Sequence, residues 1–151
     1  MTSTHAALHA DWLGACRRAV EGLKDVLAGA PSIAERAVET GTRGIGGDRT
    51  LVIDQSAESV VLRELEVLRA DGHHFTAFSE ECGDVDYGDT DVRVIIDPID
   101  GSLNAKRGLP HHALSLAVAD GPTMADVAFG FVYDFGPAEE WWARRACRAP
   151  T

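Results

Sequence analysis

The stretch Ile95-Ile96-Asp97-Pro98-Ile99-Asp100-Gly101-Ser102 leads from an apolar strand into two carboxylates, a glycine and a hydroxyl. Because the proline fixes its own φ and keeps the preceding residue extended, we expect the strand to end here in a sharp turn. Residues three apart in such a turn converge, so Asp97 and Asp100 should point at one place. Converging carboxylates repel unless a cation or a shared proton lies between them. The N–H groups of the glycine and serine can face an anion, so the stretch predicts metal-assisted phosphate chemistry.

A turn of this sequence also has a purely structural interpretation. Its two acids could accept hydrogen bonds from nearby backbone N–H groups and hold the turn without any ligand. The turn alone does not separate this interpretation from a metal site. Magnesium takes octahedral oxygen coordination and keeps several waters, so a few carboxylates and one carbonyl oxygen would be enough to bind it.

The same residues carry a family resemblance. Asp97 to Ser102 resembles the signature of the inositol monophosphatase superfamily, which includes the fructose-1,6-bisphosphatases and the bisphosphate nucleotidases. Ser79-Glu80-Glu81 is similar to the family's Glu-Glu metal motif, and Asp54 to its aspartate at a strand end before a helix. The family's Gly-x-Pro and Gly-x-Val-Tyr segments resemble Gly108-Leu109-Pro110 and Gly130-Phe131-Val132-Tyr133-Asp134. The resemblance runs over roughly residues 10 to 144, about the first half of a family member.

The resemblance implies a magnesium-dependent phosphomonoesterase that acts on a small phosphorylated polyol or sugar. Inositol 1-phosphate is the favoured substrate, with fructose-1,6-bisphosphatase or bisphosphate nucleotidase activity as the alternatives. Two or three Mg²⁺ ions would activate a water and neutralise the phosphoryl oxygens. Carried over residue by residue, the metal ligands are Glu80, Asp97, the Ile99 carbonyl oxygen and Asp100; the catalytic residues are Glu80, Ser102 and Asp54; the substrate-binding residues are Asp100, Gly101 and Ser102.

Four of these positions have further expected features. Ser102 stands where the family more often has threonine, and it keeps the hydroxyl that would position the attacking water together with Glu80. Asp54 would lie behind the metal-bound waters, or else act as a plain N-cap of the following helix. Glu81 would orient neighbouring ligands. The family's lithium sensitivity is expected through the same magnesium sites.

Periodicity along the chain predicts an α+β fold in which N-terminal helices pack on a largely antiparallel sheet. The resemblance makes this the layered αβ sandwich of the sugar phosphatases. Helices are expected over residues 8–27, over a short segment opened by a Ser32–Glu35 capping box, and from Asp54 to Asp71. A turn or hinge is expected at the glycines of 41–47. Strands are expected at residues 50–53, 75–78, 92–96, 113–118, 127–133 and 140–144. The strand over 92–96 is apolar on nearly every residue and should be buried on both faces.

The composition of the chain argues against some classes of binding partner. The 151 residues carry a net charge of −10 without a basic stripe, which argues against nucleic acid as a macromolecular partner. A phosphate substrate would meet a repulsive field around residues 80–100 unless bound cations reverse it. Three cysteines, far apart and without metal spacing, favour a reduced, cytoplasmic setting. No apolar run is long enough to span a bilayer, so no membrane partner is expected. A homodimer is left open.

Other polar groups have simpler explanations. Residues 84–89 fail as a calcium loop and should form a solvated acidic loop. The adjacent pairs His73–His74 and His111–His112 do not converge as i,i+4 pairs would, and we assign them no role. Cys82 lies beside acids that should raise its pKa, so we do not expect it to act as a nucleophile.

Residues 1–144 are expected to form a metal-binding phosphatase domain that lacks the C-terminal half of the family fold, including one further ligand aspartate. Residues 145–151 do not resemble the family's continuation, and we expect an atypical tail that arises from a frameshift or a truncated gene model. The competing class is therefore a non-catalytic, metal-binding fragment. In that case the strands over 127–133 and 140–144 should expose an apolar face meant for the missing half.

Overall fold

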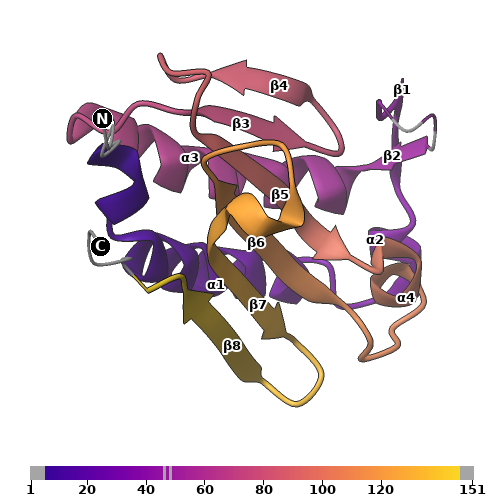
Figure 1. Ribbon diagram of the computed structural model, residues 1–151. Helices are drawn as coiled ribbons and strands as arrows, with labels where there is room; N and C mark the ends of the chain where they lie inside the picture. The colour runs from indigo at the N-terminus through magenta and orange to yellow at the C-terminus, as the bar shows by residue number, and fades with distance from the viewer. Residues whose placement is uncertain (1–5, 46, 48, 147–151) are drawn as a thin grey trace, which may run out of the picture.

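Two long helices lie on one side of a six-stranded sheet in the computed structural model, which describes residues 6–45, 47 and 49–146 (Figure 1). The helices are η1 (Ala6–His9), α1 (Trp12–Ala28), α2 (Ile33–Arg36), α3 (Val52–Ala70), α4 (Ser102–Lys106) and η2 (Met124–Asp126). The strands are β1 (Glu39–Arg43), β2 (Arg49–Leu51), β3 (Thr76–Ser79), β4 (Gly83–Asp86), β5 (Arg93–Asp100), β6 (Ala113–Ala119), β7 (Val127–Asp134) and β8 (Glu139–Arg144).

The strand order of the large sheet is β4-β3-β5-β6-β7-β8, and β1 pairs with β2 apart from it. Strands β3 and β5 run parallel, whereas their other neighbours in the sheet pair antiparallel. From β5 to β8 the strands that follow one another along the chain are antiparallel neighbours, with α4 between β5 and β6 and η2 between β6 and β7, while α3 precedes β3 and packs against β5. This confirms the predicted α+β class with helices on a largely antiparallel sheet.

Helix α1 turns a buried stripe toward the sheet. The Asp11 side chain accepts a hydrogen bond from the Gly14 N–H at 3.0 Å and caps the first turn. The buried positions recur at helical spacing: Trp12, Ala15, Cys16, Ala19, Val20, Leu23 and Leu27. Trp12 lies edge-on to Phe75, with ring centroids 5.2 Å apart, so the core sits between the helices and the sheet. The predicted helix is confirmed from residue 12 onward, and η1 forms a separate turn before it.

The predicted capping box of the second helix is also present. The Ser32 N–H donates to Glu35 Oε2 at 2.9 Å, and the Glu35 N–H donates to Ser32 Oγ at 3.2 Å. Both donors would otherwise lack an intrahelical partner in the first turn. The reciprocal pair therefore starts α2 where the sequence predicts it.

The face of the large sheet that points away from α1 and α3 is not covered by a helix (Figure 1). One row across this face holds Phe78, Ile95, Ala117, Gly130 and Ala143, and the next holds Asp97, Ser115, Val132 and Trp141. Phe78, Ile95 and Trp141 are 41%, 50% and 53% exposed. The prediction that residues 92–96 are buried on both faces is therefore wrong, because the long helices cover only one side (Figure 1). The apolar face expected on β7 and β8 is exposed, at Val132 and Trp141.

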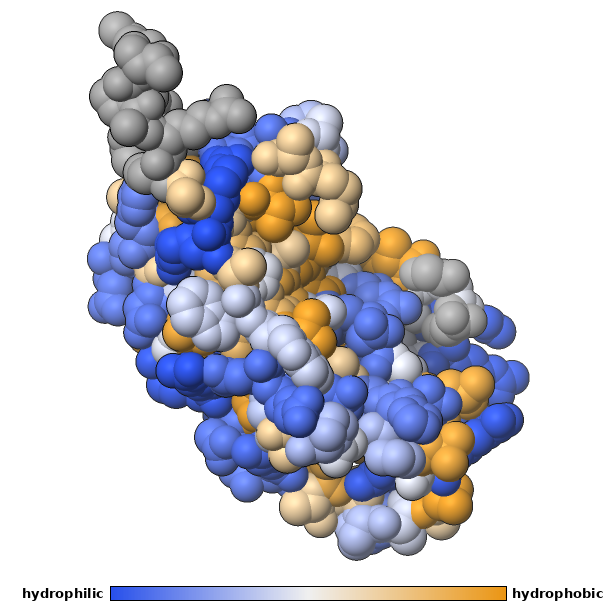
Figure 2. Space-filling view, turned by 60° about the horizontal axis from the view of Figure 1, so that its bottom comes forward, coloured by the Kyte–Doolittle hydropathy of each residue, from blue (hydrophilic) through white to orange (hydrophobic). Residues whose placement is uncertain are grey.

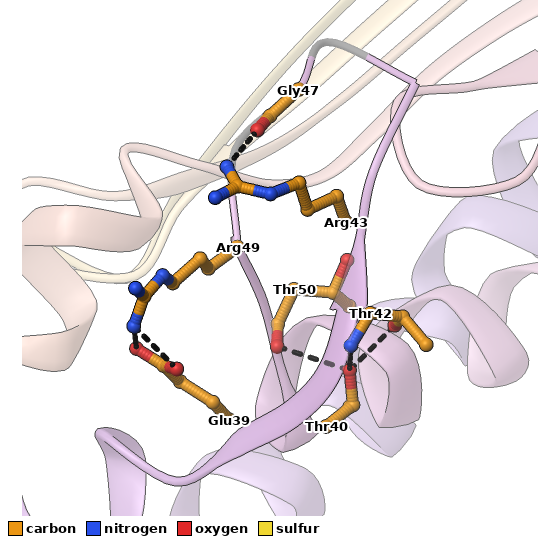
Figure 3. Close-up of polar contacts among 7 residues, drawn as sticks. All are labelled: Glu39, Thr40, Thr42, Arg43, Gly47, Arg49 and Thr50. Carbon is orange, nitrogen blue, oxygen red and sulfur yellow. Dashed lines mark hydrogen bonds and ion pairs between the residues drawn. The ribbon is translucent and has the colours of Figure 1, made fainter.

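Strands β1 and β2 form a small antiparallel hairpin at the start of α3 (Figure 3). Arg49 forms an ion pair with Glu39 at 3.0 Å, and the Arg43 guanidinium donates to the Gly47 carbonyl oxygen at 2.7 Å. The predicted turn over 41–47 is thus wrong for residues 41–43, which belong to β1. Pairing with β2 extends them in spite of the glycine. Gly46 lies outside the described residues.

The predicted acidic loop over 84–89 is in part a strand. Residues 84–86 belong to β4, where Val85 pairs with Ala77 of β3. Because β4 is at the edge of the sheet, its acids stay in water while its backbone pairs. Residues 147–151, most of the tail predicted at 145–151, lie outside the described residues. None of the described helices combines the length and the apolarity needed to cross a bilayer.

Candidate functional site

Strands β3 and β5 are parallel neighbours, so their C-terminal ends lie at the same edge of the sheet. Strand β3 ends at Ser79 and leads directly to Glu80 and Glu81. Ser79 pairs with Ile96, so Glu80 and Asp97 are the next residues on two adjacent strands. The fold thereby places the acids predicted from two separate motifs beside one another.

The Asp97–Asp100 segment does not form the predicted turn. Strand β5 continues to Asp100, and its register with β6 shifts between Asp97, opposite Ser115, and Asp100, opposite Ala113. Three residue steps on β5 therefore face two on β6, which is a bulge. Pro98 has no N–H to give to the ladder, and bulges are where a strand accommodates proline. The prediction of a sharp turn at this point is wrong for that reason.

The turn comes at Gly101, the residue before α4. Gly101 has φ +87°, and a Cβ there would lie 2.7 Å from the His111 carbonyl oxygen. Glycine is the residue that takes this conformation without strain. Ser102 is the first residue of α4, so its N–H group lies among the free donors of a helix start. No hydrogen bond within the described part of the chain joins Ser102 to Glu80.

Arg36 holds α4 against the end of α1. Its guanidinium donates to the carbonyl oxygens of Ala30 at 2.8 Å, Ala105 at 2.9 Å and Leu27 at 3.4 Å. One side chain therefore fixes the short helix that follows Gly101. Sequence reasoning missed this contact, because a bond from a side chain to distant carbonyl groups leaves no residue pattern.

Asp54 lies inside the first turn of α3 and is not its N-cap. The helix begins at Val52, and the Asp54 carboxylate accepts a hydrogen bond from the Leu51 N–H at 3.3 Å. Its side chain is buried. The predicted N-cap role is wrong because Val52 and Ile53, which favour strands, already belong to the helix. An acid in the first turn is still favoured there by the helix dipole.

Two buried groups behind the acids were missed from the sequence. Thr50 Oγ1 donates to Glu81 Oε2 at 2.6 Å, and the Cys82 N–H donates to Glu58 Oε1 at 3.1 Å. Both contacts fix the turn that follows β3. Glu58 comes one helical turn after Asp54, and an acid at that spacing within a buried apolar stripe was the available signal.

Burial and the charges of neighbouring acids both raise the pKa values of Asp54 and Asp97. Burial, followed by the charges of Glu80 and Asp100, raises the pKa of Asp97 from 3.8 to about 6. Burial also raises the pKa of Asp54 to about 6, with the charges of Glu81 and Glu80 adding to it against the Leu51 N–H. Acids from α3, β3 and β5 therefore lie in one repulsive field.

This donor set fits a hard divalent cation. Carboxylates and the adjoining Ile99 carbonyl group are the oxygen ligands that Mg²⁺ takes, and a bound cation would relieve the repulsion that raises the two pKa values. Within residues 6–45, 47 and 49–146, no three His, Cys, Asp or Glu side chains already stand as a metal-binding cluster. The individual ligand roles stay predictions.

Two groups near the site have structural explanations. Partial burial, a hydrogen bond to Glu58 and that acid's charge raise the pKa of Cys82 to about 11, which argues against a thiolate nucleophile. His112 is buried, with Nδ1 3.1 Å from the Leu109 carbonyl oxygen and its ring stacked on Phe135 at 5.5 Å. It is a packing residue.

A cavity of about 830 Å³ opens on the uncovered sheet face beside the acids. Glu80 and Asp97 line it, together with apolar side chains that include Phe78, Ile95 and Trp141. Figure 2 shows apolar residues gathered in a hollow in the upper part of the view. The acids thus border an apolar surface.

The chain matches the model of the inositol monophosphatase family over residues 11–150. It is 33% identical over 133 residues to the fructose-1,6-bisphosphatase/inositol-1-monophosphatase of Archaeoglobus fulgidus, covering 88% of this chain and 49% of that protein. It is 37% identical over 82 residues to the Nus factor SuhB of Escherichia coli, covering 54% of this chain and 29% of that protein.

Solved structures agree with this match. The MJ0109 gene product, described as an inositol monophosphatase–fructose 1,6-bisphosphatase, superposes with a TM-score of 0.73 at 26% identity, over 89% of this chain and 50% of that one. The chain spans about half the length of the curated relatives that match most of it. Because the family model covers almost all of the sequence and the fold is shared, the chain belongs to the inositol monophosphatase family.

Proposed function

We propose that this protein is a magnesium-dependent phosphomonoesterase for a small phosphorylated polyol or sugar, with inositol 1-phosphate as the favoured substrate. The observation that carries the proposal is that three acids lie together at one edge of the sheet: Asp54 of α3, which is buried, Glu80 directly after β3, and the half-buried Asp97 of β5. Membership of the inositol monophosphatase family also supports the proposal. Repelling acids beside a cavity are what a cation-dependent phosphate site requires.

Each residue would have a distinct task. The cations would be held by Glu80, Asp97, the Ile99 carbonyl oxygen and Asp100. Bound Mg²⁺ supplies positive charge that neutralises the phosphoryl oxygens and lowers the pKa of water. Glu80 and the Ser102 hydroxyl would orient the attacking water, and the N–H groups of Gly101 and Ser102 would hold the phosphate oxygens. Asp54 would lie behind the metal-bound waters, and Glu81 would orient the neighbouring ligands.

The alternatives are fructose-1,6-bisphosphatase activity, bisphosphate nucleotidase activity, and a fragment that binds metal without turnover. Phosphate release from inositol 1-phosphate, fructose 1,6-bisphosphate and a nucleoside bisphosphate, with and without Mg²⁺, separates them. We expect Mg²⁺-dependent release that is fastest with inositol 1-phosphate and is lost in Asp97→Asn. Saturable Mg²⁺ binding without release would favour the fragment, and the absence of any Mg²⁺ effect would refute the metal site.

Two further expectations stay predictions: a cytoplasmic location and the exclusion of nucleic acid. Relatives named Nus factor SuhB are the reason to test the last of these. A filter-binding assay with labelled RNA at physiological salt would do so. Binding that persists in the presence of competitor RNA would contradict the exclusion.

A further inference from the structure

Helix α3 carries a second buried carboxylate, Glu58, which has no task in the proposed chemistry. Its residue is 8% exposed and comes one helical turn after Asp54, so both acids lie on the buried side of the helix. A carboxylate is costly to bury unless its oxygens accept hydrogen bonds. Building on the proposed function, we propose that Glu58 is a positioning residue of the magnesium site, which holds the segment that carries Glu80 without binding the cation itself.

The segment that Glu58 holds is the connection between β3 and β4. Ser79 at the end of β3 pairs with Gly83 at the start of β4, which leaves the residues from Glu80 to Cys82 as the whole connection. Glu80 is the first of them and lines the cavity. In so short a connection, a displacement of the last residue moves the first as well. The position of the Glu80 carboxylate therefore depends on what holds Cys82.

Hydrogen bonds from two other parts of the fold hold this connection. They run from the Ile45 N–H to the Glu80 carbonyl oxygen at 3.2 Å, from Thr50 Oγ1 to Glu81 Oε2 at 2.6 Å, and from the Cys82 N–H to Glu58 Oε1 at 3.1 Å. The first two come from the small hairpin, which stands apart from the large sheet. Only the third of them links the connection to α3, whose buried face belongs to the core. A carboxylate also accepts a backbone N–H more strongly than a neutral oxygen does.

The placement of Glu58 suits a supporting contact rather than a metal ligand. Glu80 and Asp97 are the acids among the described residues that line the cavity, and Glu58 is not one of them. One of its oxygens already accepts the Cys82 N–H. Contacts of this kind fix the orientation of a ligand from behind, and their loss typically lowers metal affinity about 10- to 100-fold.

Two conservative variants separate the reach of this side chain from its charge. Glu58→Gln keeps the length and an acceptor oxygen but removes the charge. Glu58→Asp keeps the charge, but it is shorter by one carbon–carbon bond, about 1.5 Å, and should lose the Cys82 N–H. Both variants leave a polar group of similar size at the buried position, and circular dichroism checks that they fold.

Calorimetric titration of Mg²⁺ into the full 151-residue chain at pH 7.5 compares them. We expect Glu58→Asp to raise the dissociation constant at least about tenfold and Glu58→Gln to stay within about threefold of the wild type. Val61→Ala is the control for a general loss of stability, because Val61 is 1% exposed on the same helix and belongs to the core. It should leave the dissociation constant unchanged.

The other outcomes overturn the proposal in different ways. Weak binding by Glu58→Gln with near wild-type binding by Glu58→Asp would show that Glu58 acts through its charge. Unchanged binding in both variants would remove its role in the site and leave the proposed function standing. A wild-type chain without saturable Mg²⁺ binding would refute the magnesium site itself, and the role of Glu58 with it.

Hydrogen exchange in the absence of divalent cations tests the contact independently of the metal. The Cys82 amide should be protected in the wild type, in Glu58→Gln and in Val61→Ala, and it should exchange rapidly in Glu58→Asp. A Cys82 amide that stays protected in Glu58→Asp would show that the hydrogen bond survives the shorter side chain. Weakened Mg²⁺ binding in that variant would then have another cause, and the positioning role would be wrong.

Discussion

Asp54→Asn should stabilise the protein when no divalent cation is present. Asp54 is buried, and its pKa is raised from 3.8 to about 6, first by burial. Such a difference corresponds to at most about 3 kcal/mol against the ionised form at neutral pH. Solvent screening around the partly accessible acids reduces this to about 1–2 kcal/mol. Asparagine keeps an oxygen that can accept the Leu51 N–H and removes the charge.

The pH dependence gives the sign of the effect. The folded state takes up the Asp54 proton near pH 6, whereas the unfolded state does so near pH 4. Wild-type stability should therefore be lowest above pH 6 and should rise as the pH falls from 6 to 4. The advantage of Asp54→Asn should be complete above pH 6 and should shrink over the same interval.

Thermal and urea unfolding of the cation-free protein at pH 7.5 and pH 4.5 measure these differences. At pH 7.5 the variant should melt about 4 °C higher than the wild type. Asp25→Asn, at an exposed carboxylate of α1, is the matched control and should change little. A variant that is destabilised at pH 7.5, or that shifts equally at both pH values, would refute the claim that burial and the neighbouring acids disfavour the ionised form of Asp54.

Three substitutions test the rest of the site. Asp100→Asn should leave the fold intact, as measured by circular dichroism, and should remove Mg²⁺-dependent turnover. A near wild-type rate at saturating Mg²⁺ would contradict the assignment of Asp100 as a ligand. Gly101→Ala should lower the free energy of unfolding by about 1–2 kcal/mol, because φ is positive and the Cβ meets the His111 carbonyl group. Gly130→Ala, where a Cβ meets nothing, is its control in urea unfolding, and equal losses would contradict the steric argument. Ser102→Ala should slow turnover about 10²-fold if the hydroxyl positions water, and an unchanged rate would return Ser102 to a structural role.

The helices and caps that depend on residues close together in the sequence were predicted correctly. The stripe of α1 and the Ser32–Glu35 box depend on neighbours within one or two turns, and both were found as expected. The convergence of Glu80 and Asp97 needed the parallel pairing of β3 with β5, which only the motif order of the family could suggest. Local pattern and family order together therefore located the acids.

The errors all concern tertiary context. Pro98 was expected to end a strand, but pairing with β6 carries the strand through a bulge to Asp100. Ile95 looked buried on both faces, but burial of a sheet face depends on what packs against it. Val52 and Ile53 favour strands and yet begin α3. Arg36 and Thr50 act through partners far along the chain, which residue types alone do not reveal.

Calorimetric titration of Mg²⁺ into the wild-type chain at pH 6 tests the central claim most directly, because Asp54 and Asp97 are partly protonated there. In buffers of different ionisation enthalpy, we expect saturable binding that releases about one proton. Asp97→Asn should abolish the binding, and Asp25→Asn should retain it. The absence of saturable heat in the wild type, or equal binding in Asp97→Asn, would contradict a magnesium site built from the acids of α3, β3 and β5.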